Sequence, residues 1–155
     1  MVAIGDESVL HFLQFEDHPC IERDIARLQA KAYSTITVGR AASIISIENE
    51  LVLYFQGELK QFTTPLAFRG SSFQNITWQA LFHISYGQTR SYKELAQAIG
   101  KPSACRAVAN ANGANQIVIV IPCHRIITSN GGLGGYSAGI ARKKWLLDHE
   151  KNKKI

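Results

Sequence analysis

The chain has 155 residues, of which 46% are hydrophobic and 19% are charged, and these fractions are ordinary for a folded globular protein. They exclude a disordered chain, and no apolar run is long enough to suggest a protein that crosses a membrane. The first residues, MVAIGDESVLHF, lack the basic and then apolar layout of a secretory signal, so we expect a cytoplasmic location.

The net charge is +5, and the cysteines are Cys20, Cys105 and Cys123. This charge is compatible with a polyanionic partner such as nucleic acid, although a mildly basic protein without such a partner has the same composition. An odd number of cysteines without a CxxC pair argues against a disulfide scaffold or a zinc ribbon. We therefore expect at least one free thiol and no bound metal.

Two helices are predicted in the first part of the chain. Apolar residues recur at helical spacing between Cys20 and Tyr33, which predicts the first helix. The next stretch, AASIISIENELVLYFQGEL, is rich in β-branched residues, but its apolar positions step at threes and fours from Ile44 to Tyr54. We therefore predict a second helix that ends near Gly57.

The segment LKQFTTPLAFRGSS interrupts this periodicity with a proline, a glycine and two serines, and it predicts a linker. We expect residues 1–66 to form a small N-terminal domain and residues 70–155 to form a C-terminal domain. The C-terminal part opens with an amphipathic helix over residues 73–84, which is closed by the turn SYGQ.

A pair of short helices is predicted next. Ser91 and Glu94 have the spacing of a capping box, in front of a helix that ends at Gly100. A second helix is expected over residues 102–112. Two helices joined by a short glycine-containing turn are the outline of a helix-turn-helix, but many such pairs are only packing units.

The second of these helices is rich in alanine. Its alanines, Ala107 among them, leave a smooth face from which Arg106 is the only long cation to project. A slim helix can enter a groove of DNA closely, and a single arginine on it can reach the base stack. Alternatively the alanines pack against neighbouring helices, and both readings can hold on different faces.

The apolar run IVIVIP predicts a strand that is buried on both faces and ends at Pro122. Cys123 and His124 follow it directly. A cysteine attacks as the thiolate, so its pKa must be lowered or a base must take its proton. Adjacent side chains of a straight strand point to opposite faces, so contact between thiol and imidazole requires a bend after Pro122 or a bridging water.

An imidazole that acts as a base needs an acceptor on its other nitrogen. The late segment ARKKWLLDHE offers Asp148 and Glu150, and their spacing alone does not choose between them. Between the thiol and this segment lies the glycine-rich stretch IITSNGGLGGYSAG, in which Tyr136 and Ser137 can offer a stacking face and hydrogen bonds. From the residues alone, a nucleophilic thiol and a structural thiol both remain open.

IPCHR, preceded by ANANGANQIVIV and followed by GGLGGYSAGIARKKWLLDHE, closely resembles the O6-alkylguanine-DNA alkyltransferases, also called methylated-DNA-protein-cysteine methyltransferases. The resemblance covers about residues 73–150. It implies an α/β fold, with a small ribonuclease H-like N-terminal α/β domain and a mostly helical, winged helix-turn-helix-like C-terminal domain that binds DNA and performs the chemistry.

The resemblance also implies the activity. These proteins repair DNA by direct reversal, in which a single-turnover transfer moves the alkyl group of O6-alkylguanine to the protein's own cysteine, here Cys123. The thioether is not hydrolysed, so each molecule acts once. The implied partner is double-stranded DNA that bears O6-alkylguanine and is bound in the minor groove. A monomer is implied, without cofactor, metal or membrane.

Residue by residue, the resemblance assigns roles around Cys123. His124 deprotonates the thiol through a water, and Glu150 orients His124. Asn115 ties the helix-turn-helix to the active-site segment. The substrate-binding residues are Tyr92, which helps to turn the nucleotide out and donates toward guanine N3, and Tyr136 and Ser137, which form the pocket wall and the hydrogen bond to O6.

On the DNA side, Arg106 matches the arginine that fills the space left by the flipped base, and Ala107 lies beside it on the helix that enters the minor groove. Two departures from the family stand out. The usual opening hairpin with its Pro-Leu-Gly turn is replaced by an abrupt start, so the first strand is expected to be missing. Ser85 stands where the family commonly has proline.

Three other functions compete with this one. A damage-binding relative that does not repair would lack the acceptor, and Cys123 is present. A helix-turn-helix regulator with a sensor thiol would need an effector or dimerisation element, and none is evident in the sequence. A Cys-His-Glu hydrolase would need an oxyanion hole and gives no reason for a DNA-binding helix.

Overall fold

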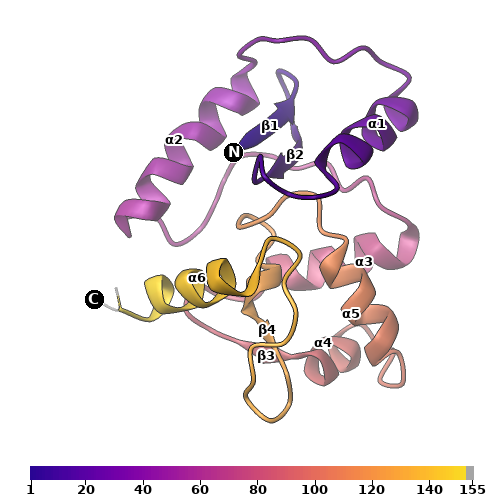
Figure 1. Cartoon of the computed structure of the whole chain (residues 1–155), viewed down its shortest axis with the longest axis vertical. Helices are drawn as coiled ribbons and strands as arrows, with labels where there is room; N and C mark the ends of the chain where they lie inside the picture. The colour runs from indigo at the N-terminus through magenta and orange to yellow at the C-terminus, as the bar shows by residue number, and fades with distance from the viewer. Residues whose placement is uncertain (153–155) are drawn as a thin grey trace. The chain divides into compact units, whose positions relative to one another are not determined.

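The structure, a computed structural model, describes residues 1–152 and forms two compact units, Met1–Arg69 and the part of the chain from Gly70 onward (Figure 1). It is a mixed α/β fold, as the family resemblance implied, and its sheets are small and two-stranded. Within residues 1–152, no helix is both long enough and apolar enough to cross a membrane.

The N-terminal unit begins with an antiparallel hairpin of β1 (Val2–Gly5) and β2 (Leu10–Gln14). Its turn is held by the carboxylate of Asp6, whose Oδ1 accepts hydrogen bonds from the backbone of Ser8 at 2.8 Å and of Val9 at 2.9 Å. This is the usual way in which a short acidic side chain fixes a turn.

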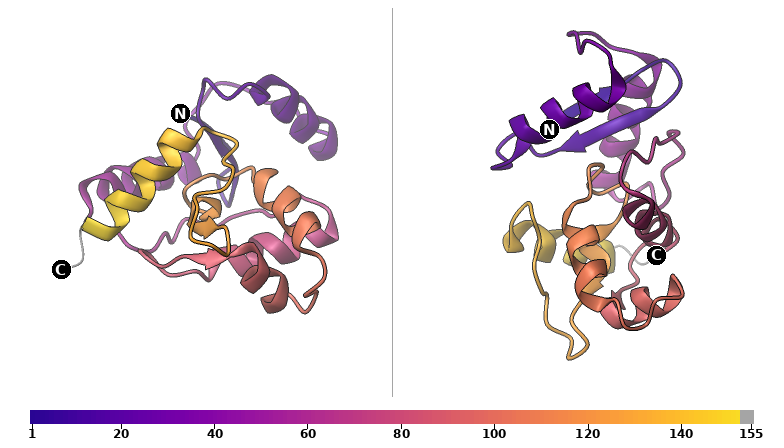
Figure 2. Two further views of the ribbon diagram at one scale, coloured as in Figure 1. Left: turned by 60° about the horizontal axis from the view of Figure 1, so that its bottom comes forward. Right: turned by 90° about the vertical axis from the view of Figure 1, so that its right-hand side faces the viewer.

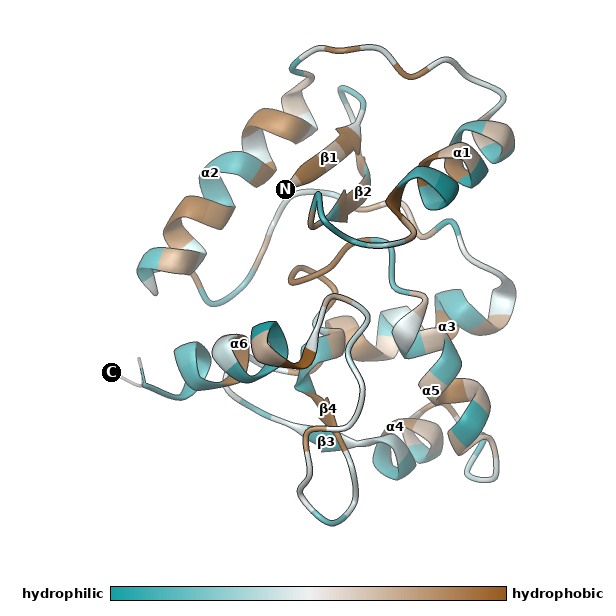
Figure 3. Ribbon diagram, in the orientation of Figure 1, coloured by the Kyte–Doolittle hydropathy of each residue, from teal (hydrophilic) through white to brown (hydrophobic). Residues whose placement is uncertain are grey.

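Helices α1 (Ile21–Ala32) and α2 (Ala42–Gln56) confirm the two helices predicted for this unit. Gly57 ends α2 in the left-handed conformation, with φ of 78°, which glycine adopts without the steric cost of a Cβ. Helix α2 packs on both strands and buries Ile47 and Tyr54, and apolar colouring recurs along the hairpin and α2 (Figure 3).

A buried carboxylate fixes the segment that follows α2. Glu50 is only 8% exposed, and its two oxygens accept four hydrogen bonds, from the backbone and hydroxyl of Thr63 at 2.7 and 2.5 Å and of Thr64 at 3.1 and 2.8 Å. Burial works against ionisation of this group, but the hydrogen bonds from both threonines hold its pKa below the usual value.

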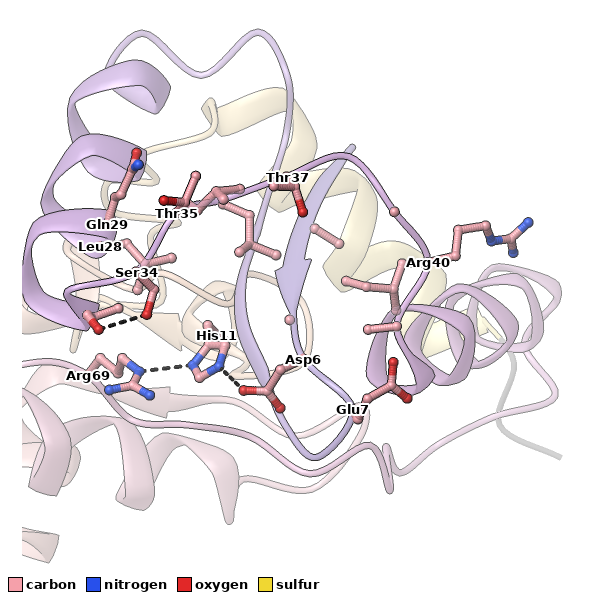
Figure 4. Close-up of a pocket in the computed structure, with 18 residues that line it drawn as sticks. Asp6, Glu7, His11, Leu28, Gln29, Ser34, Thr35, Thr37, Arg40 and Arg69 are labelled. Atoms are coloured by element: carbon pink, nitrogen blue, oxygen red, sulfur yellow. Dashed lines mark hydrogen bonds and ion pairs between the residues drawn. The ribbon is translucent and has the colours of Figure 1, made fainter.

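The N-terminal unit also contains a cavity of about 520 Å³ between β1, α1 and the loop that joins α1 to α2 (Figure 4). At its edge, Arg69 Nε donates to His11 Nδ1 at 2.9 Å, and the other ring nitrogen lies 2.7 Å from Asp6 Oδ2. The hydrogen bond from His11 is the largest cause that lowers the pKa of Asp6 to about 2. None of the site residues expected from the sequence lines this cavity.

Helices α3 (Ser72–Phe82), α4 (Tyr92–Ala98) and α5 (Cys105–Gly113) pack against one another in the C-terminal unit, as the views in Figure 2 also show. The capping box of Ser91 and Glu94 at the start of α4 is confirmed, with both reciprocal hydrogen bonds present. Helix α5 starts a few residues later than expected.

The predicted strand before the thiol is wrong. Residues 117–121 are buried, but they form a tight turn, in which Ile121 donates to the carbonyl of Ile117 at 3.0 Å. Asn115 replaces a partner strand, because its Oδ1 accepts from Ile117 N at 3.0 Å and its Nδ2 donates to Ile121 O at 2.7 Å. Ile119 has a φ of 73°, which costs a β-branched residue roughly 1–3 kcal/mol.

The chain bends directly after Pro122. One turn of 3₁₀ helix, η1 (Cys123–Arg125), leads into β4 (Ile126–Ile127), which pairs in parallel with β3 (Arg90–Ser91). Helix α6 (Ile140–Asn152) follows the glycine-rich loop. The thiol and its neighbouring imidazole are therefore held on a curved segment between the Asn115 turn and a short sheet.

Candidate active site

The thiol of Cys123 is buried at the first position of η1. The residue is 1% exposed, and Asn115 Nδ2 lies 3.1 Å from its sulfur. Burial raises the pKa of the thiol to about 11, although the hydrogen bond from Asn115 and the charge of Lys143 act in the opposite direction. The thiol is therefore protonated at neutral pH, and its use as a nucleophile requires a base.

His124, the next residue in the chain, is fully buried. Its Nε2 lies 2.8 Å from Glu150 Oε1, whereas its Nδ1 has no hydrogen-bond partner within residues 1–152. Burial lowers the pKa of His124, against the opposite effect of Glu150. The carboxylate fixes the proton of the neutral ring on Nε2, so Nδ1 presents a lone pair that can accept a proton.

The structure decides between the two acidic candidates of α6. Glu150 is 1% exposed and is the partner of His124. Asp148 instead pairs with Lys144, four residues before it on α6, at 2.5 Å and with both side chains exposed to solvent. Glu150 lies on the buried side of α6, facing His124, whereas Asp148 lies on the exposed side. The spacing of the two residues in the sequence did not establish which of them faces His124.

Glu150 also receives a bidentate ion pair from Arg125, whose Nε and Nη2 each lie 2.9 Å from a carboxylate oxygen. The backbone of Gly87 donates to the same carboxylate at 3.0 Å. Burial opposes ionisation of Glu150, but the hydrogen bonds from His124 and Arg125 hold its pKa well below the usual value. The carboxylate is therefore a fixed negative charge behind the imidazole.

A hollow of about 320 Å³ brings together Tyr92, Tyr136 and Ser137, the three substrate-binding residues expected from the sequence. The rest of its wall consists of small and amide residues, namely Ala109, Asn110, Asn112, Gly113 and Gly135. Burial raises the pKa of Tyr92, and that of Tyr136 more strongly, and a charged Cys123 would raise both further. Both phenols are therefore protonated hydrogen-bond donors close to the thiol.

The glycine-rich loop can approach Tyr92 because position 134 has no side chain. A Cβ there would lie 3.1 Å from the Tyr92 hydroxyl, and the φ of Gly134 is 69°. The loop is also held by Lys143, whose ammonium is buried and donates to the carbonyls of Ile126 at 2.5 Å and of Gly135 at 3.1 Å.

Helix α5 presents two different faces. Val108 and Ala111 are buried against neighbouring helices, and the indole nitrogen of Trp78 on α3 donates to the carbonyl of Ala111 at 2.8 Å. Arg106 and Ala107, the two DNA-binding residues expected from the sequence, are exposed. One side of α5 therefore packs against neighbouring helices, and the other side is an open, slim surface, as both interpretations of its alanines allowed.

The burial of two polar residues in this region was not predicted from the sequence. Lys143 stands in a run of basic residues that is typical of a solvated helix face, and Asn112 stands among other asparagines. Asn112 is 4% exposed, and its Nδ2 donates to the carbonyl of Cys123 at 3.3 Å. No local pattern distinguishes either residue from an exposed one. Over residues 1–152, no three acidic, histidine or cysteine side chains gather in a way that could hold a metal ion.

Comparison with known proteins identifies the relatives of this arrangement. The model of the 6-O-methylguanine DNA methyltransferase, DNA binding domain, matches residues 72–152. A methylated-DNA–protein-cysteine methyltransferase of Mycobacterium tuberculosis is 51% identical over 105 residues, which are 68% of this chain and 64% of the relative. An inducible one of Bacillus subtilis is 49% identical over 102 residues, or 66% of this chain and 57% of the relative. The chain thus aligns with somewhat less than two thirds of these relatives' length.

Solved structures extend the likeness to both units. Mycobacterium tuberculosis OGT in complex with DNA matches with a TM-score of 0.80 and 38% identity, over 97% of this chain and 85% of that one. The O6-methylguanine-DNA methyltransferase of Pyrococcus kodakaraensis matches with a TM-score of 0.73 and 28% identity, over 96% and 89% of the two chains. The chain therefore belongs to the O6-methylguanine DNA methyltransferase family.

Proposed function

We propose that this protein repairs DNA by direct reversal, by transferring the alkyl group of O6-alkylguanine to Cys123 in a single turnover. The observation that carries the proposal is the buried, hydrogen-bonded pair of His124 and Glu150 that directly follows the buried thiol of Cys123 in the chain, together with a hollow bounded by Tyr92 and Tyr136. A protonated thiol next to a neutral imidazole with a free lone pair is arranged for proton removal at the moment of reaction.

The transfer proceeds as an in-line displacement. His124 Nδ1 takes the thiol proton through one bridging water, and Glu150 stabilises the imidazolium that forms. The thiolate attacks the alkyl carbon, so a C–S bond forms while the C–O6 bond breaks and its electron pair stays on the guanine. Tyr92 donates a hydrogen bond or a proton toward N3, and the proton taken from the thiol finally compensates the guanine anion.

The burial of the thiol implies a movement on binding. Because Cys123 is 1% exposed, the alkylated guanine base reaches its sulfur only when a neighbouring segment of the protein shifts. The glycine-rich loop is the segment suited to this, since Gly134 and Gly139 have φ of 69° and 101° and the loop contributes Tyr136 and Ser137 to the hollow. In the shifted state, Ser137 donates to O6.

The partner in this proposal is double-stranded DNA. The exposed Arg106 and Ala107 of α5 approach the minor groove, and Arg106 fills the place of the flipped nucleotide, whose extrusion costs a few kcal/mol of stacking. The likeness to M. tuberculosis OGT in complex with DNA supports this partner. Asn115 acts by joining the turn that follows α5 to the thiol.

The family also suggests the finer architecture that we propose here. Residues 1–66 form a ribonuclease H-like domain, and residues 70–155 form a winged helix-turn-helix-like domain. The protein acts as a monomer in the cytoplasm, without a cofactor.

The test is a count of repaired lesions. A duplex with one O6-methylguanine is mixed with increasing amounts of protein, and the remaining lesion is measured by nucleoside analysis. We expect one lesion to be lost for each protein molecule, without further turnover, and Cys123→Ala to remove none. Catalytic turnover, or binding without any loss of lesion, would overturn the proposal.

A further inference from the structure

The cavity of the N-terminal unit lies along the edge of a strand. Strand β1 pairs with β2 in a two-stranded sheet, and over residues 1–152 Val2, Ala3 and Ile4 make no backbone hydrogen bond outside this hairpin. Successive residues of a strand point to opposite faces, yet Ala3, Ile4 and Gly5 all line the cavity. A cavity that three successive residues bound follows the edge of the strand and not one of its faces.

This edge lacks the usual protection against pairing. Alternate residues of an edge strand direct their N–H and C=O groups away from the sheet, and proteins commonly block such an edge with a charge, a proline or a covering segment. The sequence of β1, VAIG, contains neither a charge nor a proline, and its four residues are partly exposed. The cavity separates β1 from the loop that joins α1 to α2 (Figure 4). The edge is therefore open to a further strand.

The lining of the cavity suits a polypeptide in extended conformation. Its volume of about 520 Å³ lies within the range of ligand pockets, roughly 300–1,000 Å³. The wall opposite β1 is apolar in part and carries hydroxyl groups in part, from Leu28, Ala32, Ser34, Thr35, Ile36, Thr37 and Ile44. An added strand presents its side chains alternately to two sides, so a segment in which apolar and hydroxyl-bearing residues alternate matches this wall.

Two carboxylates lie at the end of the cavity where β1 enters its turn. The hydrogen bond from His11 lowers the pKa of Asp6 to about 2, and Glu7 is an exposed residue of the same turn. Of the two lining arginines, Arg40 has a carboxylate partner on α2, and Arg69 donates through Nε to His11. A strand added antiparallel to β1 begins at this end, so a lysine near its start faces the two carboxylates.

We propose that the N-terminal unit contains a peptide-binding site, in which an extended segment of another polypeptide pairs antiparallel with β1 as a third strand. The backbone of this segment bonds to the open edge of β1, and its apolar side chains fill the cavity. A basic residue near its start lies opposite Asp6 and Glu7. All lining residues belong to the N-terminal unit, so this site is independent of the thiol and of the proposed function.

The experiment uses the full chain and the synthetic peptide Lys-Thr-Val-Thr-Val-Thr. Calorimetric titration measures binding, and amide hydrogen exchange locates the pairing. We expect saturable binding of one peptide for each chain, with slower exchange at the amides of β1. Two N-methylated peptides, one methylated at the threonines and one at the valines, have the same side chains. The form whose methyl groups face β1 should bind about tenfold more weakly than the other, because it loses its hydrogen bonds to the strand.

Two substitutions test the walls of the site. Ala32→Trp fills the cavity from α1 and should remove most of the binding, whereas Ala26→Trp, the same exchange at an exposed position of α1 outside the lining, is the matched control. Glu7→Gln should weaken the lysine peptide about threefold and leave a peptide with threonine in place of lysine unaffected.

Three results would overturn the inference: no saturable binding, equal binding of the two methylated peptides, or slowed exchange that spares β1. Slow exchange at β1 without peptide, in a protein that sediments as a dimer, would also overturn it, because the edge would then pair with a second copy of the chain. None of these results depends on alkyl transfer to Cys123, so they leave the test of the proposed function separate.

Discussion

Each unit of this protein contains one glutamate that is almost completely buried, and the two differ in the groups that surround them. Glu50 in the N-terminal unit accepts from the backbone and hydroxyl groups of two threonines, which are neutral and do not titrate near neutral pH. Glu150 in the C-terminal unit accepts from the imidazole of His124 and the guanidinium of Arg125.

Burial and hydrogen bonding alone therefore do not mark a functional carboxylate. Both pKa values are held below the usual value by hydrogen bonds that outweigh burial. Glu50 satisfies the backbone of a chain segment, whereas Glu150 sets the tautomer of a histidine next to a thiol. The neutral threonine donors indicate a structural role for Glu50, whereas the histidine and arginine donors support the chemical role that we propose for Glu150.

The largest effect is expected on stability. Glu150→Gln leaves the Arg125 guanidinium buried without a counter-charge and should cost about 3–5 kcal/mol of unfolding free energy. Glu50→Gln keeps one acceptor oxygen for its neutral donors and should cost only about 1–3 kcal/mol. Denaturant unfolding followed by circular dichroism measures both losses of free energy. The fluorescence of Trp78 and Trp145 reports the unfolding of the C-terminal unit. A greater loss of unfolding free energy for Glu50→Gln than for Glu150→Gln would contradict the difference proposed between the two carboxylates.

The next effect concerns the transfer itself. His124→Gln removes the base without leaving an uncompensated charge, and should slow single-turnover transfer at neutral pH by about 100-fold. Because the pKa of Cys123 is raised to about 11, the rate of the variant should climb with pH as the thiol ionises without help. Glu50→Gln is the control and should transfer at close to the normal rate. An unchanged rate in His124→Gln would show that the relay does not act as proposed.

The two units should also differ on the DNA side. Arg106→Ala should slow transfer from duplex DNA about tenfold at low DNA concentration and make the affinity less dependent on salt. Arg23, an exposed arginine on α1 of the N-terminal unit, is the matched control, and Arg23→Ala should have little effect. Equal effects of the two substitutions would indicate nonspecific attraction by net charge instead of contact through α5.

The smallest effect is a pH dependence of stability that arises in the C-terminal unit. Burial lowers the pKa of His124 from its ordinary value of 6.5. Its contribution to stability is therefore present above that value and is lost as the pH falls toward the lowered pKa, by at most about 1.4 kcal/mol per pH unit. Melting temperatures between neutral pH and mild acid should fall for the natural sequence and stay flatter for His124→Gln. Parallel curves would show that His124 contributes nothing.

Much of the fold could be predicted where short-range signals decide it. The capping box of Ser91 and Glu94 and the left-handed Gly57 at the end of α2 are local, and both were found from the sequence. The prediction of a strand at residues 117–121 was wrong because a run of β-branched residues indicates that a segment is buried more reliably than it indicates that the segment pairs with another strand. The side chain of Asn115 closes this segment as a turn, and composition does not reveal such a bond.

The site was predicted only in part for a similar reason. Cys123 and His124 are adjacent in the sequence, so their juxtaposition needs only a bend. The choice of Glu150 over Asp148 depends on the phase of a helix against a residue far away in the chain. Asn112 and Lys143 are polar residues whose burial follows from tertiary packing, and their types alone suggest an exposed surface.

The most direct test of the account is a peptide map after reaction with an O6-methylguanine duplex. The chain offers three thiols as internal competitors, and in the proposed mechanism the methyl group goes to Cys123, the buried one, and not to the more accessible Cys20 or Cys105. We predict a gain of one methyl group on the Cys123 peptide alone, in proportion to the guanine restored. Methylation of Cys20 or Cys105, or guanine restored without any methylated peptide, would contradict it.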